Sequence, residues 1–154
     1  MPTTSPPRPP ARLWLSATLL LLVAAAGAIS AEERSEYGNP FTWVTLGQVK
    51  VKAEAVQSPQ KTYLGLSHRK ELPEGRGMLF AMPAKELQRF CMRGMNFPLD
   101  FIWLVPGKVA GLAQNVPADF PGEICSPEPV SHVLEVPAGF IERYGIQVGD
   151  PAHW

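Results

Sequence analysis

Residues 90–105 read FCMRGMNFPLDFIWLV, and the apolar run that ends this stretch decides the fold. The run LDFIWLV is apolar at nearly every position, which is typical of a strand covered on both faces. Pro106 and Gly107 follow and suit the two central positions of a type II turn, where glycine supplies the positive φ. The next nine residues, KVAGLAQNV, predict a returning strand and therefore a β-hairpin.

Other segments carry the same β signal. Upstream, QVKVKAEAV (48–56) alternates apolar and charged residues, and a period of two indicates a strand with one buried face. Residues 42–46 predict a partner strand that turns back at Gly47. Further strands are expected at 78–80 and 131–136, with a last strand or turn around residues 148–150.

Two short helices are expected between the strands. Ser58 can cap a helix that starts at Pro59, where the missing N–H costs nothing, and that ends near Leu66. The second covers residues 140–144, and Gly145 would end it as a left-handed cap.

Two segments predict irregular structure. Residues 83–88 look like a connector with at most one helical turn, and residues 115–130 contain four prolines, which cannot donate to a β-ladder. We therefore expect a mainly β fold, a compact antiparallel sandwich or barrel-like domain with two or three short helices. An α+β fold is the alternative.

The first 31 residues resemble a targeting segment. They carry Arg8 and Arg12 but no acid, then an apolar run of 16 residues from Leu13 to Ala28, then small residues up to Ala31. This order is typical of a secretory signal peptide. A membrane-spanning helix usually needs ~20 apolar residues, so cleavage is favoured over a retained anchor, which stays the alternative.

The remaining chain is long enough for one domain. We expect a signal peptide at residues 1–31, a flexible linker at 32–40 and a single β-rich domain at 41–154. The protein would be exported to the periplasm or the extracellular space. If the leader were not cleaved, it would anchor the protein to the membrane and provide its only membrane contact.

The charge argues against nucleic acid as a partner. The whole chain has 14 bases and 14 acids, and loss of the leader would leave a net charge of −2. Phosphate binding needs a clear positive excess. However, residues 61–93 hold seven bases and three acids, whereas residues 94–154 hold two bases and seven acids. The two segments either pair across the fold, which we favour, or leave a basic pocket for an anionic small ligand.

Several blocks resemble a known family. KTYLGLSHRKELPEGRGMLF (61–80), FCMRGMNFPLD (90–100) and SHVLEVPAGFIERYGIQVGD (131–150) follow, in order, the pattern of the domain of unknown function 192 family over about residues 42–152. The resemblance implies a small, mostly antiparallel β fold with short helices, commonly behind an export signal, and it implies no accepted activity. The matching positions are Gly65, Leu66, Arg69, Gly77 to Phe80, Phe90, Met92, Arg93, Pro98 to Asp100, Val133 to Glu135, Gly139, Gly145, Gly149 and Asp150.

Both cysteines stand where the sequence departs from that family. Cys91 replaces the usual Trp after Phe90, and Ile124-Cys125 replaces an aromatic residue before a Ser-Pro step. Two cysteines in an exported chain suggest a Cys91–Cys125 disulfide, whose loop would stabilise the fold by ~3–4 kcal/mol. The alternative is two separate buried thiols.

Asp100 leads to a candidate binding site. On an extended strand it shares a face with Ile102 and Leu104, so a buried Asp100 needs a partner, which Arg69 or Arg93 could supply. Two interpretations give Asp100 a structural role only. In the first, the ion pair fixes the start of the strand; in the second, Asp100 lies exposed at the strand start. The functional interpretation is a cleft around an unknown ligand. Its predicted lining is Arg69, Met78, Phe80, Met92, Arg93, Asp100 and Glu135.

Three functions fit these observations. The favoured one is a non-catalytic binding or accessory protein of the cell envelope, whose apolar cleft is rimmed by Arg and Asp and takes a small ligand or an envelope component. The second is an envelope hydrolase that uses Asp100 and Glu135 as a carboxylate pair, provided that their separation suits it. The third is a purely structural or interaction protein. No catalytic residue, cofactor or metal site is predicted, because the three histidines lack ligand spacing and neither HExxH nor CxxC occurs.

Overall fold

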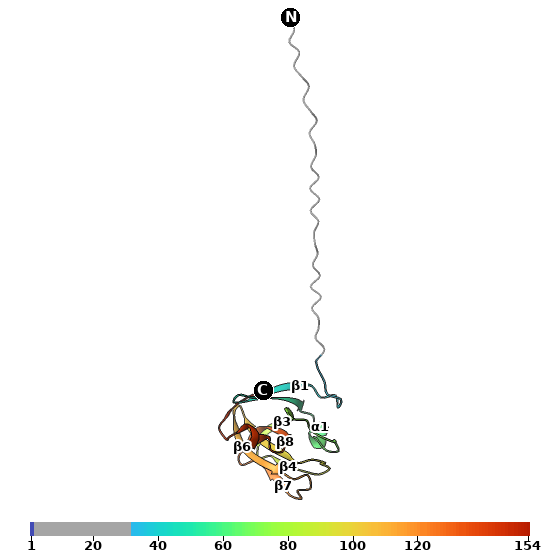
Figure 1. Ribbon diagram of the computed structural model, residues 1–154, viewed down its shortest axis with the longest axis vertical. Helices are drawn as coiled ribbons and strands as arrows, with labels where there is room; N and C mark the ends of the chain where they lie inside the picture. The colour runs from blue at the N-terminus through green and yellow to red at the C-terminus, as the bar shows by residue number, and fades with distance from the viewer. Residues whose placement is uncertain (2–31) are drawn as a thin grey trace. The chain divides into compact units, whose positions relative to one another are not determined.

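The computed structural model describes Met1 and residues 32–154 (Figure 1). The predicted signal peptide therefore lies outside the described residues, apart from Met1. The elements in chain order are β1 (Phe41–Leu46), β2 (Val49–Val56), α1 (Pro59–Leu64), β3 (Arg76–Glu86), β4 (Arg89–Cys91), β5 (Leu99–Val105), β6 (Gly107–Val116), β7 (Glu123–Cys125), β8 (Val130–Pro137), α2 (Phe140–Tyr144) and β9 (Pro151–His153). No helix among residues 32–154 has the length and apolar character needed to cross a bilayer.

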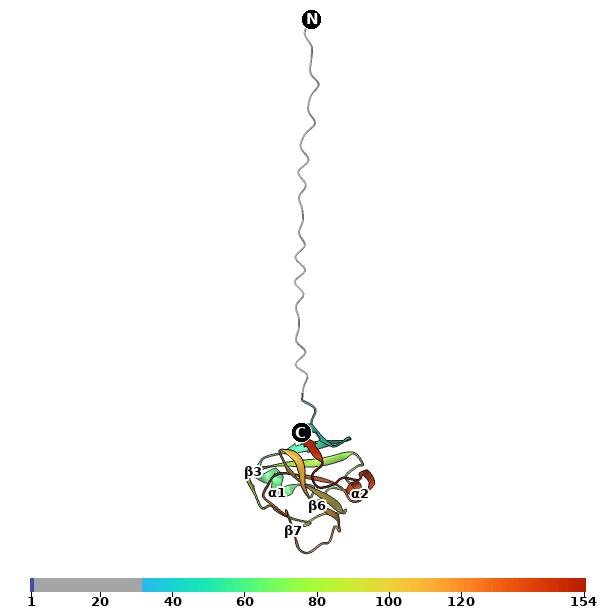
Figure 2. The same cartoon turned by 90° about the vertical axis from the view of Figure 1, so that its left-hand side faces the viewer.

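Seven strands close into a barrel in the order β1-β2-β3-β8-β5-β6-β9, and β9 completes it by pairing with both β1 and β6. Strands β4 and β7 form a separate two-stranded sheet beside the barrel (Figures 1 and 2). The prediction of a mainly β, barrel-like domain with short helices is confirmed.

One pairing differs from the expected antiparallel sheet. Strands β2 and β3 run parallel, with Ala53 opposite Gly77. Parallel neighbours need a long crossover so that the chain can return to the same end, and the segment with α1 provides it. The next pairing, β3 with β8, is antiparallel again.

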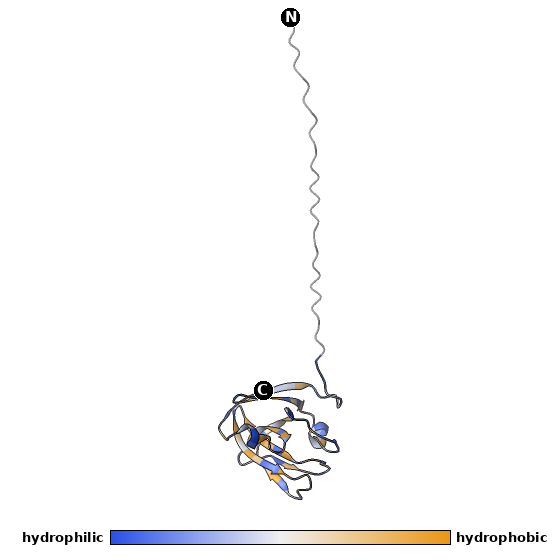
Figure 3. Cartoon of the chain, in the orientation of Figure 1, coloured by the Kyte–Doolittle hydropathy of each residue, from blue (hydrophilic) through white to orange (hydrophobic). Residues whose placement is uncertain are grey.

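The apolar side chains form two cores, one on each face of the barrel wall. The inner core lies inside the barrel and includes Ile102, Leu104 and Val136, and the outer core includes Phe101 and Trp103. All seven residues of β5 are buried because they alternate between these cores, as its continuous apolar run predicts. Hydrophobic residues occur along many strands of the domain (Figure 3).

Turn residues behave as their chemistry requires. Gly107 has φ 88°, which allows the tight turn between β5 and β6, and Gly145 ends α2 in the left-handed region with φ 62°.

Three predictions of irregular structure are wrong in detail. The expected connector at 83–88 is mostly the end of β3, which pairs Glu86 with Val130, and the proline-rich 115–130 segment contains β7. Residues 32–40, expected to be a flexible linker, fold against the barrel, where the side chains of Ser35 and Asn39 both donate to Glu54. A buried carboxylate without donors would be costly, so Glu54 favours this docked arrangement.

Candidate functional site

A cleft of about 270 Å³ lies between the α1 segment and β4. One wall is the end of α1 and the turn that follows it, and the other wall is β4 with the loop after it. The barrel strands β3, β5 and β8 supply the floor. The residues that line the cleft include Tyr63, Ser67, Phe80, Met82, Arg89, Phe90, Arg93, Met95, Leu99 and Glu135.

Local sequence signals place the α1 wall. The Ser58 hydroxyl accepts a hydrogen bond from the Lys61 backbone N–H at 3.4 Å, and Pro59 begins the helix, as predicted. Gly65 ends α1 with φ 50°, and a Cβ there would lie 3.5 Å from the Phe80 ring. That distance is an ordinary van der Waals contact, so it is the positive φ that favours glycine at this turn.

Glu135 lies at the floor and is the least usual group in the cleft. Its position on β8 is opposite Met78 on one side and Phe101 on the other, and the residue is only 5% exposed. Its carboxyl forms no hydrogen bond with any of the described residues. Burial raises the pKa of Glu135 to about 8, although the positive charge of Arg69 acts in the opposite direction. At neutral pH the carboxyl is therefore protonated.

Arg69 does not enter this cleft. Its guanidinium pairs with both carboxylate oxygens of Glu54, at 2.5 and 3.0 Å, and lies 3.7 Å from the centroid of the Tyr37 ring. Burial alone would raise the pKa of Glu54, but hydrogen bonds from Arg69, Asn39 and Ser35 outweigh it, and the pKa is lowered. The predicted site residue Arg69 thus belongs to a buried structural ion pair.

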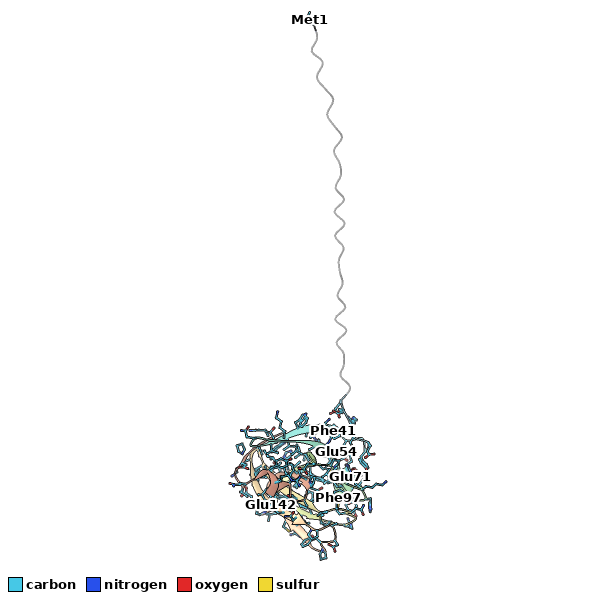
Figure 4. The ribbon with its side chains drawn as sticks, viewed as in Figure 1. Met1, Phe41, Glu54, Glu71, Phe97 and Glu142 are labelled. Atoms are coloured by element: carbon cyan, nitrogen blue, oxygen red, sulfur yellow. The ribbon has the colours of Figure 1, made fainter. Side chains whose placement is uncertain are left out.

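The Glu54–Arg69 pair borders a separate hollow of about 380 Å³. Phe41 and Glu71 line the same hollow, and Figure 4 labels these two residues on either side of Glu54. Three arginines and three glutamates line it, so it has no excess of either charge.

The mouth of the cleft is basic. The guanidinium carbon of Arg93 lies 4.8 Å from the centroid of the Tyr63 ring, and Arg93 makes no ion pair within residues 32–154. Arg89 lies 3.8 Å from Glu123, and both side chains are exposed. Arg143 of the 94–154 segment pairs with Glu74 of the 61–93 segment at 2.7 Å. Among residues 32–154 these two ion pairs join the charged segments, so the favoured pairing of the segments occurs only in part.

Asp100 has a structural role. It is fully buried on the inner face, and its carboxylate accepts hydrogen bonds from the backbone N–H groups of Asn115 at 2.7 Å and Ile141 at 2.8 Å. Asn115 has φ 52° at a register shift in β6, and Ile141 lies in the first turn of α2. Asp100 therefore holds a β-bulge and the start of a helix. The expected pairing of Asp100 with Arg69 or Arg93 is wrong.

The register also separates the two carboxylates of the predicted hydrolase. Asp100 lies opposite Val136 on β8, so its side chain shares the inner face with Val136. Glu135 is the neighbouring residue on β8 and points to the outer face. A barrel wall lies between Asp100 and Glu135, and they cannot flank one bond of a substrate.

Three of the seven predicted lining residues meet in the cleft: Phe80, Arg93 and Glu135. Met78 is fully buried in the outer core beneath, and Met92 is 3% exposed and lines a neighbouring hollow. The cleft is also lined by five residues that the sequence did not indicate: Tyr63, Met82, Arg89, Phe90 and Met95. Phe90 could have been found, because it belongs to the same sequence block as Arg93, but no local signal pairs α1 with β4.

The expected Cys91–Cys125 bond is not formed in the structure. Both thiols are free and exposed, which also differs from the alternative of buried thiols. Cys91 lies opposite Glu123 and Cys125 opposite Arg89, so the cysteines are diagonal neighbours on β4 and β7. Diagonal positions are about 7–8 Å apart, beyond the usual Cα separation of about 4.4–6.8 Å for a disulfide.

Metal ligands do not gather in the described residues, among which no group of three or more His, Cys, Asp or Glu could hold an ion. The cleft lining contains one carboxylate and no histidine. It can therefore bind a small molecule by one buried carboxyl, apolar walls and a basic rim, and it lacks a nucleophile–base pair of the usual kind.

Comparison with known proteins gives a family and a fold. The family described as "Uncharacterized ACR", domain of unknown function 192, matches residues 42–154. A protein of unknown function from Novosphingobium aromaticivorans DSM 12444 is similar, with 27% identity and a TM-score of 0.76, over 82% of this chain and 94% of that one. A "putative transcription regulator" from Sinorhizobium meliloti 1021 has 27% identity and a TM-score of 0.70, over 75% and 94% of the two chains. No curated protein matches.

Proposed function

This chain belongs to the domain of unknown function 192 family, and from that premise we propose that it is a non-catalytic binding or accessory domain that holds a small ligand in the cleft under α1. The observation that carries the proposal is the buried carboxyl of Glu135, which lies at the floor of an apolar cleft and has no hydrogen-bond partner within residues 32–154. A buried polar group without a partner costs stability, and proteins retain such costs mainly at functional sites.

The basic mouth and the apolar walls support binding more than catalysis. Arg93 is exposed and without an ion pair in the described residues, so it is available to a ligand that enters between α1 and β4. Phe80, Met82 and Leu99 offer apolar surface below it. A few polar groups that converge above apolar walls are typical of small-molecule sites.

We also propose that residues 1–31 direct export and that the domain acts in the periplasm or outside the cell as an accessory of the envelope. The order of basic, apolar and small residues in the leader supports this proposal. Expression of the full chain in a bacterium, fractionation and intact-mass analysis test it. Periplasmic protein that has lost about 31 residues is expected, whereas full-mass protein in the membrane fraction would indicate an anchor instead.

Nucleic acid is not a proposed partner, although one similar structure carries a regulator's name. The chain has equal numbers of acids and bases, and nucleic-acid binding relies on a positive excess.

Arg93→Ala tests the binding proposal, with Arg143→Ala as the matched control. Both side chains are exposed, but Arg143 lies on α2 and pairs with Glu74 at 2.7 Å, outside the cleft. Native mass spectrometry of the full chain, after incubation with a panel of amino acids, organic acids and amines, would detect retained ligand. We expect Arg93→Ala to lose the ligand that wild type and Arg143→Ala keep, with unfolding free energies within about 0.5 kcal/mol. Equal retention by all three proteins would contradict the proposal, and so would a failure of the panel to yield any ligand.

A further inference from the structure

Resting on the proposed function, we infer that the ligand of the cleft is a zwitterion that binds with its cationic group at Glu135 and its anionic group at Arg93. This inference names the ligand class and the direction in which the molecule enters, neither of which follows from a binding function alone.

The floor supplies a site for a cation. Glu135 is more than nine-tenths buried, lines the cleft and has no hydrogen-bond partner within residues 32–154. The positive charge of Arg69 acts on Glu135, but both terminal nitrogens of Arg69 donate to Glu54. An ionised carboxylate at this buried position needs an opposite charge, so Glu135 ionises at neutral pH only when a ligand brings a cation to it.

The surroundings of Glu135 contain little else that titrates. From β3 and β5 the neighbours are Met78, Phe80 and Phe101, none of which carries charge. The charged or titratable groups that share the cleft with Glu135 are Tyr63 from α1 and Arg89, Cys91 and Arg93 from β4 and the loop after it.

Aromatic rings favour an organic ammonium group at the floor. Phe80 and Phe90 both line the cleft, edge to face, with their ring centroids 5.1 Å apart. Ring faces attract cations most strongly where water is excluded. A metal ion is disfavoured by the same lining, because Glu135 is its only carboxylate and it has no histidine.

The mouth supplies the complementary site for an anion. Arg93 rests on the Tyr63 ring, which positions its guanidinium at the rim. A guanidinium binds a carboxylate or phosphate through two parallel hydrogen bonds. Between rim and floor the surface is apolar, from Met82 and Leu99, so the two charges of the ligand should be separated by a methylene chain.

Binding should release a proton. Without a bound cation, burial raises the pKa of Glu135 to about 8, so the carboxyl is protonated at pH 7. An ammonium ion that docks there favours the carboxylate: Glu135–COOH and R–NH₃⁺ give the ion pair Glu135–COO⁻···⁺H₃N–R and one proton in solution. Nearly one proton per ligand is therefore expected at pH 7.

Isothermal titration calorimetry of the full chain with ω-amino acids, from β-alanine to 6-aminohexanoate, tests this inference. Titrations at pH 7 in two buffers of different ionisation enthalpy count the protons released. We expect at least one chain length to bind with proton release, and hexanoate or hexylamine to bind about tenfold or more weakly, because each lacks one charge-assisted contact.

Two variants assign the ends of the ligand. Glu135→Gln should weaken binding of the amino acid about tenfold or more and abolish proton release. Arg93→Gln should weaken binding of the amino acid but leave the affinity for hexylamine unchanged. Unchanged affinity in Glu135→Gln would overturn the inference. Arg93-dependent binding of hexanoate without proton release would also overturn it, while the proposed function would stand. If neither the amino acids nor any panel compound bound, both would fall.

Discussion

Replacement of Glu135 by glutamine should stabilise the protein at neutral and alkaline pH. Burial raises the pKa of Glu135 from 4.5 to about 8, so between these pH values the folded protein holds a proton that the unfolded chain has released. The folded state then loses stability as pH rises, by up to about 1.4 kcal/mol per pH unit.

The size of the effect follows from that window. The contribution of Glu135 is fully present below pH 4.5 and is lost as pH rises through 8. At pH 7 the accumulated cost is about 3 kcal/mol, and well above pH 8 it approaches about 5 kcal/mol. Glutamine has the same shape and cannot ionise, so Glu135→Gln avoids this cost.

Urea unfolding of wild type and Glu135→Gln at pH 4, 5, 7 and 9 measures the difference in unfolding free energy. The variant should match wild type near pH 4 and exceed it by several kcal/mol at pH 9. Other titrating groups cancel in the difference, because both proteins contain them. Glu142→Gln is the control, since Glu142 is an exposed acid on α2 (Figure 4), and its difference from wild type should not grow with pH.

If the difference in unfolding free energy between Glu135→Gln and wild type stayed constant from pH 4 to pH 9, this reasoning would be refuted. It would mean that Glu135 is ionised in the folded protein, with a partner or solvent that stabilises its charge. The proton release expected on ligand binding would then be wrong as well. The functional test and the stability test therefore examine the same carboxyl by independent measurements.

Three further predictions concern the rest of the fold. Asp100→Ala should lower the unfolding free energy by about 2–5 kcal/mol, because the buried N–H of Ile141 and the partly buried N–H of Asn115 lose their acceptor; a loss in urea titrations below 1 kcal/mol would contradict this. Glu54→Gln leaves Arg69 buried without its counter-charge and should cost about 3–5 kcal/mol at pH 7. In wild type this stabilisation should disappear as pH falls below 4.5, because the folded pKa of Glu54 is lowered; a thermal melt insensitive to acid would count against it. Cys91 and Cys125 should both react with an alkylating reagent in the native protein, and a product without adducts would instead reveal a bond.

Much of the secondary structure was predictable because it depends on neighbours in the chain. The alternation in residues 48–56 and the continuous apolar run of β5 each report how many faces are buried, and both strands form as expected. The ends of α1 and α2 follow from Ser58, Pro59 and Gly145, whose local chemistry does not depend on the rest of the fold. The parallel β2–β3 pairing and the strand β7 depend on distant partners, and local patterns did not reveal them.

The candidate site was predictable only in part. The sequence indicates that Asp100 and Glu135 are acids among apolar residues and that both need an explanation. It cannot indicate that backbone N–H groups of β6 and α2 satisfy Asp100, while nothing in the described residues satisfies Glu135. Similarly, Arg69 and Arg93 look equivalent in the sequence, yet Arg69 pairs with Glu54, whereas Arg93 makes no ion pair within residues 32–154.

The amino-acid sequence by itself determined the family, the β character, the double burial of β5 and the positions of the turns, because side-chain periodicity and backbone preference act over a few residues. The tertiary structure alone decided that Glu135 faces a cleft while Asp100 faces the barrel interior. Those faces depend on the register of β5 against β8, where a shift of one residue reverses every side chain. That register is set by two cores packed on opposite faces of the barrel wall, which involve residues far apart in the chain.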